Sequence, residues 1–194
     1  MKGILFNLLE DVVVDAYDID LWDRVIDRAG VHGSYSSVGR YDERELKALV
    51  GGLGELCSAA RGASDGEMLK WFGVQAMVPL AERYPAFFEP HDHTVDFILT
   101  LNDVIHAEVL KLHPDAEVPT FQFSGVRRTG GVSSVTLHYT SGRMMCALAE
   151  GFTIGAAGRF GERATVRHRS CMLDGDTECR MDCTFERSAP NVDS

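Results

Sequence analysis

The chain has 194 residues, of which 45% are hydrophobic and 25% charged, a composition typical of one soluble globular domain. Its formal net charge of -10, from 19 Lys and Arg against 29 Asp and Glu, argues against binding to nucleic acid or to a membrane surface. Glu10 and Asp11 interrupt the apolar start, so the sequence predicts neither a signal peptide nor a membrane span. We therefore expect a cytoplasmic protein.

Helices are predicted over the first two thirds of the chain, where apolar residues recur three or four apart. Their expected ranges are 2–15, 18–29, 41–60, 64–79 and 93–113. The last third alternates and is rich in Val, Thr and Phe, which predicts the strands "TFQFSGV", "GGVSSVTLHYT", "ATVRHRSCM" and "ECRMDCTFE". A further helix is predicted at about 143–160, between the second and third strands.

This order of elements predicts an α+β fold, in which a helical N-terminal half packs on a C-terminal antiparallel sheet that flanks one long helix. The connection "HPDAEVPTF" marks the passage from one half to the other. A cleft between two such halves is a natural ligand site. The last residues, 188–194, are expected to form a frayed tail.

His106 stands out among the seven histidines. In "DFILTLNDVIHAEVLKL", the apolar residues Ile98, Ile105 and Val109 form one stripe of the predicted helix, and His106 borders that stripe. A histidine in this position is either a hydrogen-bonded core residue or a ligand. A neutral imidazole nitrogen is a common axial ligand of gas-binding haem iron.

Tyr139, Ser141 and Arg143 lie two residues apart, where the second predicted strand gives way to the helix. If the chain stays extended through this junction, all three side chains point the same way. They are then either a polar cap on the strand end, with Ser141 opening the helix, or a clamp for an anion. An always-charged guanidinium beside two hydroxyls suits the two propionates of a haem.

The segments "MKGILFNLLEDVV" and "LNDVIHAEVLKLHPDAEVPTF" and the motif Tyr139-x-Ser141-x-Arg143 together resemble the H-NOX (haem nitric-oxide/oxygen-binding, HNOB) domain over roughly residues 1–187. The resemblance implies haem b with His106 as its axial ligand and the motif residues on its propionates. It implies one domain, with a helical distal part at about 1–65 and a proximal haem-binding and sheet part at about 66–187. The implied haem pocket comprises Leu5, Leu9, Phe72, Gly73, Ala76, Phe97, Pro119 and Leu148.

The residues on the distal side of the implied haem pocket determine which gas the haem is expected to bind. Family members that hold oxygen use a tyrosine hydroxyl, which would fall five residues after Arg143, where this chain has Leu148. The supporting positions, Leu9 and Ala76, are apolar as well. By this resemblance the protein binds nitric oxide, and also CO, without stable oxygen binding, although core packing alone also accounts for buried leucines.

A signalling mechanism follows from this reading. Nitric oxide bound opposite His106 weakens the iron–imidazole bond, and rupture of that bond would free the helix and let the porphyrin relax against Leu5 and Pro119. The two halves could then rotate about the cleft, with Gly73 as a hinge. Because no catalytic domain follows, we expect the state to be read by a separate partner, such as a histidine kinase or a cyclic-di-GMP enzyme (diguanylate cyclase or phosphodiesterase).

Four residues near the C-terminus could bind a second metal: His168, Cys171, Cys179 and Cys183. A hairpin turn at "DG" (174–175) would bring Cys171 and Cys179 together across two strands. Thiolates with an imidazole suit tetrahedral Zn²⁺, although buried or redox-active cysteines explain the same pattern. On spacing alone the fourth ligand is either Cys183 or Cys146.

The bacterial H-NOX proteins of the stand-alone NO-sensing type carry a zinc site that maps onto Cys146, His168, Cys171 and Cys179 of this chain. Cys183 is then an extra thiol, and Cys57 is expected to be simply buried.

Two other functions compete with NO sensing. One is a thiol redox sensor that signals by zinc release to the same partner. The other is a haem enzyme acting on NO or peroxide, which is disfavoured because no acid–base residues lie at the distal positions.

Overall fold

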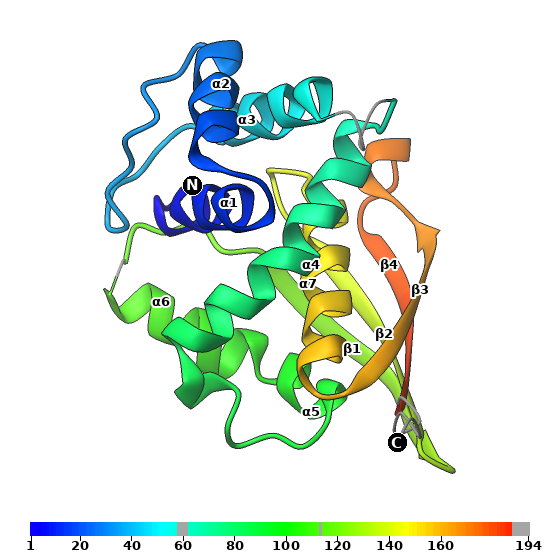
Figure 1. Cartoon of the computed structure of the whole chain (residues 1–194). Helices are drawn as coiled ribbons and strands as arrows, with labels where there is room; N and C mark the ends of the chain where they lie inside the picture. The colour runs from blue at the N-terminus through cyan, green and yellow to red at the C-terminus, as the bar shows by residue number, and fades with distance from the viewer. Residues whose placement is uncertain (58–61, 113, 188–194) are drawn as a thin grey trace, which may run out of the picture.

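A computed structural model describes residues 1–57, 62–112 and 114–187 of the chain (Figure 1). Its α-helices are α1 (Ile4–Ala16), α2 (Ile19–Ala29), α3 (Glu43–Leu56), α4 (Asp65–Arg83), α5 (Thr94–Leu99), α6 (Ala107–Leu112) and α7 (Cys146–Arg159). The π-helix η3 (Leu101–His106) lies between α5 and α6, and two short 3-10 helices are η2 (Pro85–Phe87) and η4 (Met172–Asp174). The strands are β1 (Thr120–Thr129), β2 (Val132–Thr140), β3 (Glu162–Ser170) and β4 (Cys179–Arg187).

The predicted α+β class is confirmed, since helices precede one antiparallel sheet. Three of the predicted helices differ most from their observed bounds. The helix predicted at 41–60 ends at Leu56, because the backbone of Cys57 is extended. Helix α4 begins at a capping box, in which Ser64 and Glu67 bond each other's backbone, and it runs past Pro79 to Arg83. The predicted helix at 93–113 is interrupted by the π-turn η3, where the Ile105 amide bonds the Thr100 carbonyl, five residues back, at 3.3 Å. Residues 58–60 and 113 of the predicted helices, and the predicted tail at 188–194, lie outside the described residues.

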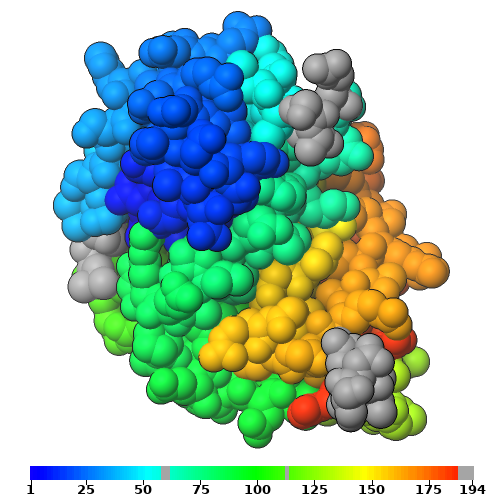
Figure 2. Space-filling model, viewed as in Figure 1, coloured from blue at the N-terminus to red at the C-terminus, as the bar shows by residue number. Residues whose placement is uncertain are grey.

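The four strands are ordered β1-β2-β4-β3, all antiparallel, so β1 and β3 are the edges. Alternate residues of β2 are buried, which gives the sheet one apolar face and one polar face. Helix α7 packs between this sheet and α4, and α1, α2 and α3 cover one end of the molecule (Figure 1). On the face shown in Figure 2, α4 and α7 run side by side at the surface.

Glycines let α4 and α7 touch through their backbones. A Cβ added at Gly73 would lie 2.7 Å from the Leu148 carbonyl oxygen, and one at Gly151 would lie 2.2 Å from the Lys70 carbonyl oxygen. Gly155 is equally close to Val74. Gly73 is therefore a site of close helix packing in the middle of a regular helix. Its role as a hinge stays a prediction.

A buried carboxylate joins the start of α5 to the sheet. Glu162, the first residue of β3, accepts hydrogen bonds from the Thr94 amide at 2.9 Å and from the His93 ring at 2.8 Å. Burial by itself raises the pKa of Glu162, but the hydrogen bonds from Thr94 and His93 outweigh burial and hold the pKa below its ordinary value. The Glu162 side chain thus ties the start of α5 to the first residue of β3.

Substitution of Glu162 by alanine is expected to lower the free energy of unfolding by about 1–3 kcal/mol, because it leaves the buried Thr94 amide without an acceptor. Since the folded pKa lies below the unfolded one, the wild-type advantage is full above the unfolded pKa and disappears as pH falls through the folded pKa. Urea unfolding of Glu162→Ala at pH 7 and pH 3 measures this. The control is Glu186→Ala, on the exposed Arg163 ion pair, and equal losses in both variants would contradict the prediction.

Candidate functional site

His106 is the last residue of η3, and its ring stacks on Phe121 of β1 with ring centroids 5.7 Å apart. Burial lowers the pKa of His106 below its ordinary value, and an interaction with the Pro119 backbone opposes that shift only in part. The ring is therefore neutral at pH 7. Within the described part of the chain, its buried Nδ1 atom has no hydrogen-bond partner. Burial of an unpaired polar atom is costly, which is expected of a residue whose partner is a bound group.

The predicted distal residues come together in the structure. Leu9, Phe72, Ala76 and Leu148 are buried in one hydrophobic cluster, and Leu5 packs against it. They belong to α1, α4 and α7, three elements that are far apart in the sequence. Burial of apolar side chains alone accounts for the packing of this cluster. None of these five side chains carries a hydrogen-bond donor, so the surface that they form is apolar throughout.

The other predicted pocket residues lie nearer the sheet. Phe97 of α5 is buried in a second cluster and stacks on Phe88 at 4.5 Å. Pro119 precedes β1 and interacts with the His106 ring through its backbone. Gly73 separates α4 from α7, as described above.

The three predicted propionate-binding residues lie at one turn, but the chain does not stay extended through it. Strand β2 ends at Thr140, and a turn follows in which the Met144 amide bonds the Ser141 carbonyl at 3.1 Å. Ser141 does not open the helix. Its Oγ accepts from the Arg143 amide at 3.2 Å, and α7 begins at Cys146. Tyr139 is buried and its hydroxyl accepts from the Met145 amide at 3.2 Å.

Burial raises the pKa of Tyr139, while hydrogen bonds from Ser141 and from the Met145 amide oppose the shift. The Tyr139 hydroxyl therefore keeps its proton at neutral pH and can donate it to an acceptor. The Tyr139 and Ser141 hydroxyls lie close together at this turn. They form a pair of donors next to Phe121, whose ring contacts the Tyr139 ring.

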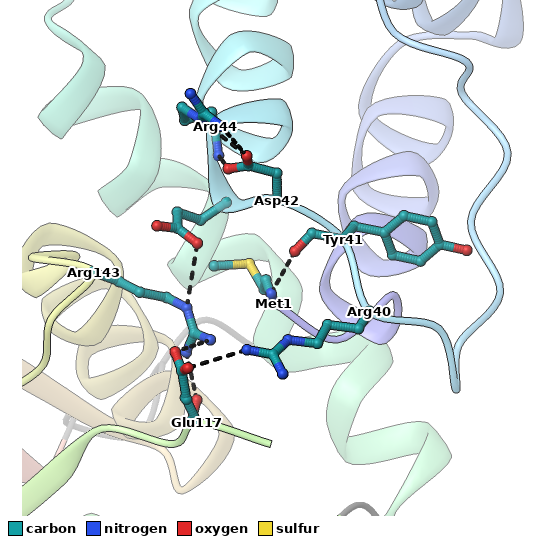
Figure 3. Close-up of a pocket in the computed structure, with 8 residues that line it drawn as sticks. Met1, Arg40, Tyr41, Asp42, Arg44, Glu117 and Arg143 are labelled. Carbon is teal, nitrogen blue, oxygen red and sulfur yellow. Dashed lines mark hydrogen bonds and ion pairs between the residues drawn. The ribbon is translucent and has the colours of Figure 1, made fainter. Parts of the chain in front are cut away.

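Arg143 extends into a polar pocket of about 490 Å³ between the N-terminal helices and the connector that precedes β1 (Figure 3). Its guanidinium donates to the Glu117 carbonyl and pairs with the Glu117 carboxylate at 3.0 Å. A longer contact of 3.7 Å joins Arg143 Nε to Glu43. The Arg143 side chain is only 13% exposed. The structure thus brings Arg143 to the same turn as the two hydroxyls but pairs it with carboxylates, the same class of group as a propionate.

Two ion pairs join the N-terminal segment to this connector. Arg40 pairs with Glu117 and Lys2 with Asp115, each at 3.1 Å (Figure 3 shows the first). Lys2 and Arg40 also form an isolated antiparallel bridge with each other. The connector leads from the helix that carries His106 to Pro119, so these contacts link the proximal residues to the N-terminal helices.

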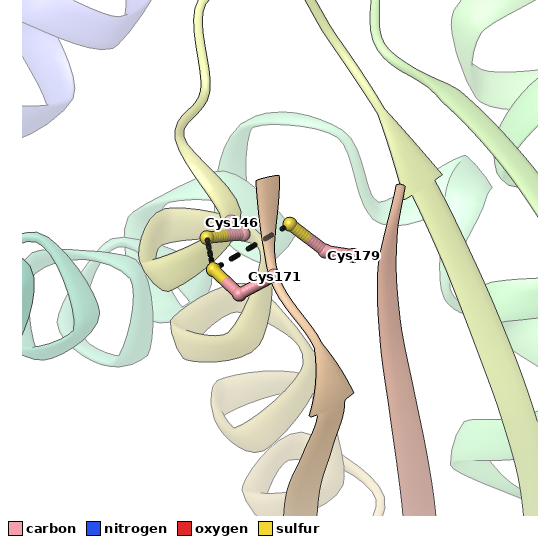
Figure 4. Close-up of side chains that lie close together, drawn as sticks. All are labelled: Cys146, Cys171 and Cys179. Carbon is pink, nitrogen blue, oxygen red and sulfur yellow. Dashed lines mark hydrogen bonds between the residues drawn. The ribbon is translucent and has the colours of Figure 1, made fainter. Parts of the chain in front are cut away.

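Three of the four predicted zinc ligands meet at the start of α7 (Figure 4). The Sγ atom of Cys171 lies 3.6 Å from that of Cys146 and 3.9 Å from that of Cys179. Tetrahedral zinc with Zn–S bonds of about 2.3 Å requires sulfur atoms roughly 3.8 Å apart. Cys171 and Cys179 therefore lie close together in the structure, as predicted. The chain reverses between them through η4 and through Gly175, which is in the left-handed conformation with φ of 96°.

The remaining candidate ligands lie outside this cluster. His168 donates or accepts through Nε2 with Glu150 of α7 at 3.1 Å, beside a bulge in β3 between His168 and Ser170. Cys183 is buried farther along β4, where burial raises the pKa of its thiol to about 12. Burial also raises the pKa of Cys146, as do the neighbouring thiols Cys171 and Cys179. As neutral thiols the three side chains can lie side by side, whereas their thiolates would repel one another unless a cation lay between them. Cys57 is buried, as predicted.

The residues present fit a haem: a half-buried neutral imidazole whose buried Nδ1 atom has no partner among the described residues, a donor-free apolar wall, and two hydroxyls with a guanidinium at one turn. Sequence reasoning missed Asn102, Phe121 and Glu117. Asn102 lies four residues before His106, and that spacing could have indicated a shared helix face. No local pattern could have indicated Glu117 as the partner of Arg40, 77 residues away.

The fold is shared with solved structures of H-NOX proteins. The "Crystal structure of an H-NOX protein from S. oneidensis in the Fe(II)NO ligation state" matches with a TM-score of 0.84 and 28% identity over 96% of this chain and 100% of that one. The unliganded Fe(II) H-NOX protein from K. algicida matches with a TM-score of 0.78 and 26% identity over 98% and 99%. The H-NOX from Shewanella woodyi in the Fe(II)CO state gives 0.74 and 29% over 100% and 99%.

These matches define the class as a haem-based gas-sensing domain. The family model described as "Haem-NO-binding" (HNOB) matches residues 2–168, and the chain belongs to this family. H-NOX domains are sensor domains rather than enzymes. A comparison with the curated proteins found no match. Among the described helices, none is long and apolar enough to cross a lipid bilayer.

Proposed function

We propose that this chain is a sensor of nitric oxide that binds the gas at ferrous haem b, does not bind oxygen stably, and signals to a separate partner protein. The observation that carries the proposal is the apolar distal cluster. Leu9, Ala76 and Leu148 are at most 5% exposed and offer no side-chain hydrogen-bond donor. Bound oxygen depends on a donor because its outer atom carries partial negative charge, whereas nitric oxide on ferrous iron depends on one far less.

The chain's own residues have distinct roles in this proposal. When bound, haem supplies the ferrous iron that takes up the gas. His106 would present a neutral imidazole nitrogen to that iron, with its ring supported by Phe121. Tyr139, Ser141 and Arg143 would hold the propionates, and Arg143 would exchange its Glu117 carboxylate for one of them.

Release of His106 is the proposed signal. The residue ends η3 and is followed directly by α6, so its displacement moves the connector that carries Asp115 and Glu117. The ion pairs of that connector with Lys2 and Arg40 would pass the displacement to the N-terminal helices. The proposed partner is a histidine kinase or a cyclic-di-GMP enzyme in the cytoplasm, where the thiols described above stay reduced.

We further propose that Cys146, His168, Cys171 and Cys179 hold a structural zinc ion. The sulfur spacing of 3.6 and 3.9 Å supports the three thiolates. His168 would complete the set by turning from Glu150. The same cluster supports a second candidate function, a thiol redox sensor, because Cys171 is partly exposed and close enough to either neighbour to pair on oxidation.

Absorption spectra of the purified ferrous protein under nitrogen, nitric oxide, CO and air test the proposed gas selectivity. Nitric oxide and CO are expected to change the spectrum, while air should only oxidise the iron. A spectral change under air that nitrogen reverses would contradict the proposal.

Replacement of Leu148 by tyrosine is expected to create reversible oxygen binding. The phenol adds one donor to the distal cluster, and one hydrogen bond in a dry site slows oxygen dissociation by about tenfold or more. Leu148→Phe is the matched control, since it adds the same ring without the hydroxyl. If the phenylalanine variant holds oxygen as long as the tyrosine variant, added bulk and not the donor is responsible.

A further inference from the structure

Asn102 makes a paired contact with the backbone of β1. The side-chain amide nitrogen of Asn102 donates to the Phe121 carbonyl oxygen, and the Phe121 amide donates back to Asn102 Oδ1 at 3.2 Å. Strand β1 is an edge strand, so every second residue turns its N–H and C=O away from the sheet. The Asn102 amide satisfies both groups of Phe121, as a neighbouring strand would.

Phe121 is also the residue against which the His106 ring lies. The ring centroids are 5.7 Å apart and the planes are inclined by 29°. On its other side Phe121 contacts the Tyr139 ring, with centroids 5.6 Å apart. Phe121 therefore touches both the proposed axial ligand and one proposed propionate-binding residue, and Asn102 fixes the backbone of Phe121.

Asn102 and His106 belong to the same π-helix, four residues apart, and so lie on a similar face. A π-turn is rare and less well packed than an α-turn, and it recurs at functional sites. No residue of η3 is fully buried, although Leu101 and Ile105 pack in part against the hydrophobic cluster that contains Phe121. The two hydrogen bonds to Phe121 add a directional contact between this turn and the edge strand.

We propose that Asn102 is the positioning residue of His106. Its paired hydrogen bonds with the Phe121 backbone keep the π-turn and the Phe121 ring in a fixed relative position, and this position determines where the imidazole would reach the iron. This inference rests on the proposed role of His106 as the axial ligand. Asn102 itself touches neither haem nor gas in this role.

Two variants of the haem-loaded chain test it. Asn102→Leu keeps the bulk of the side chain without its hydrogen bonds, and Asn102→Ala also lacks them but has the best helix propensity. Val104→Ala is the control, because Val104 lies in the same π-turn and is 45% exposed. The readouts are amide hydrogen exchange of residues 103–107 and the iron–histidine stretching band in the resonance Raman spectrum of the ferrous protein.

Exchange of these amides is expected to accelerate about tenfold in both Asn102 variants, since two hydrogen bonds are lost. The stretching band is expected to broaden and move to lower frequency, because the imidazole is no longer held in one orientation. The Val104→Ala control should change neither quantity. An unchanged band in both Asn102 variants overturns the proposal, even if exchange accelerates, because Asn102 would then only stabilise the turn.

The ligand assignment is tested separately. If His106→Ala keeps the iron–histidine band, the proposed function of His106 is wrong, and the exchange data alone then show that Asn102 holds the turn without positioning a ligand. If His106→Ala loses the band and Asn102→Leu leaves it unchanged, only the positioning role fails.

Discussion

Replacement of His106 by alanine is expected to remove the proximal ligand and lower haem affinity by at least about 100-fold, since even outer-shell changes at metal sites commonly cost 10–100-fold. His106 is half-buried and neutral at pH 7, and its buried Nδ1 atom has no hydrogen-bond partner in the described part of the chain. Phe121, the residue against which the His106 ring lies, has no atom that could replace the imidazole as a ligand. Haem titration and the ferrous absorption spectrum measure the effect.

His138→Ala is the matched control for this experiment. His138 lies on the polar face of β2 and contacts Ser124 and Glu178, away from the proposed haem residues. Its removal should leave haem affinity and spectrum unchanged. The assignment of His106 fails if the His106→Ala protein keeps the wild-type ferrous spectrum, or if His138→Ala loses it.

Replacement of Cys146 by serine is expected to reduce bound zinc from about one ion per chain to a small fraction. The ion would lose one of three sulfur ligands that already lie at the spacing of a tetrahedral site. Because Cys146 is the first residue of α7, loss of zinc should also destabilise the contact between α7 and the β3–β4 turn. Metal analysis by mass spectrometry and thermal unfolding check the two effects.

Cys183→Ser is the control that discriminates between the two fourth-ligand hypotheses. Cys183 is buried on β4 and bonds the Met181 carbonyl at 3.7 Å, apart from the cluster of three sulfurs. The variant should keep its zinc. Zinc loss in Cys183→Ser together with zinc retention in Cys146→Ser would reverse the assignment of the fourth ligand. The redox sensor would be favoured if the wild-type protein contained no zinc and formed a Cys146–Cys171 disulfide after mild oxidation.

Much of the fold was predictable because its signals are local. The helical periodicity of α1 to α4 and the alternation in β1 to β4 come from short-range patterns of burial. The π-turn was not predictable, since apolar spacing around His106 suits an α-helix equally well and the contacts that the turn makes with Phe121 span 19 residues. The turn after Thr140 was also missed, because no residue in "HYTSGR" excludes an extended chain.

The candidate site was predictable only in part, and largely through family resemblance. Residue spacing indicated that His106 and Tyr139 were unusual, but it could not bring Leu9, Ala76 and Leu148 together from three helices. The cysteine hairpin was predictable from its turn residues. The carboxylate partners of Arg143 were not, because Glu43 and Glu117 reach it from separate parts of the chain.

The backbone contact between α4 and α7 limits which mutations can compensate for one another. At Gly73 and Gly151 the atoms nearest to an added Cβ are main-chain atoms of the facing helix, whereas at Gly155 they include the Met77 side chain. A larger residue at an ordinary core position can be rescued by a smaller one opposite. At Gly73 and Gly151 no side chain opposite can be made smaller, so alanine at either position should have no second-site suppressor across the contact.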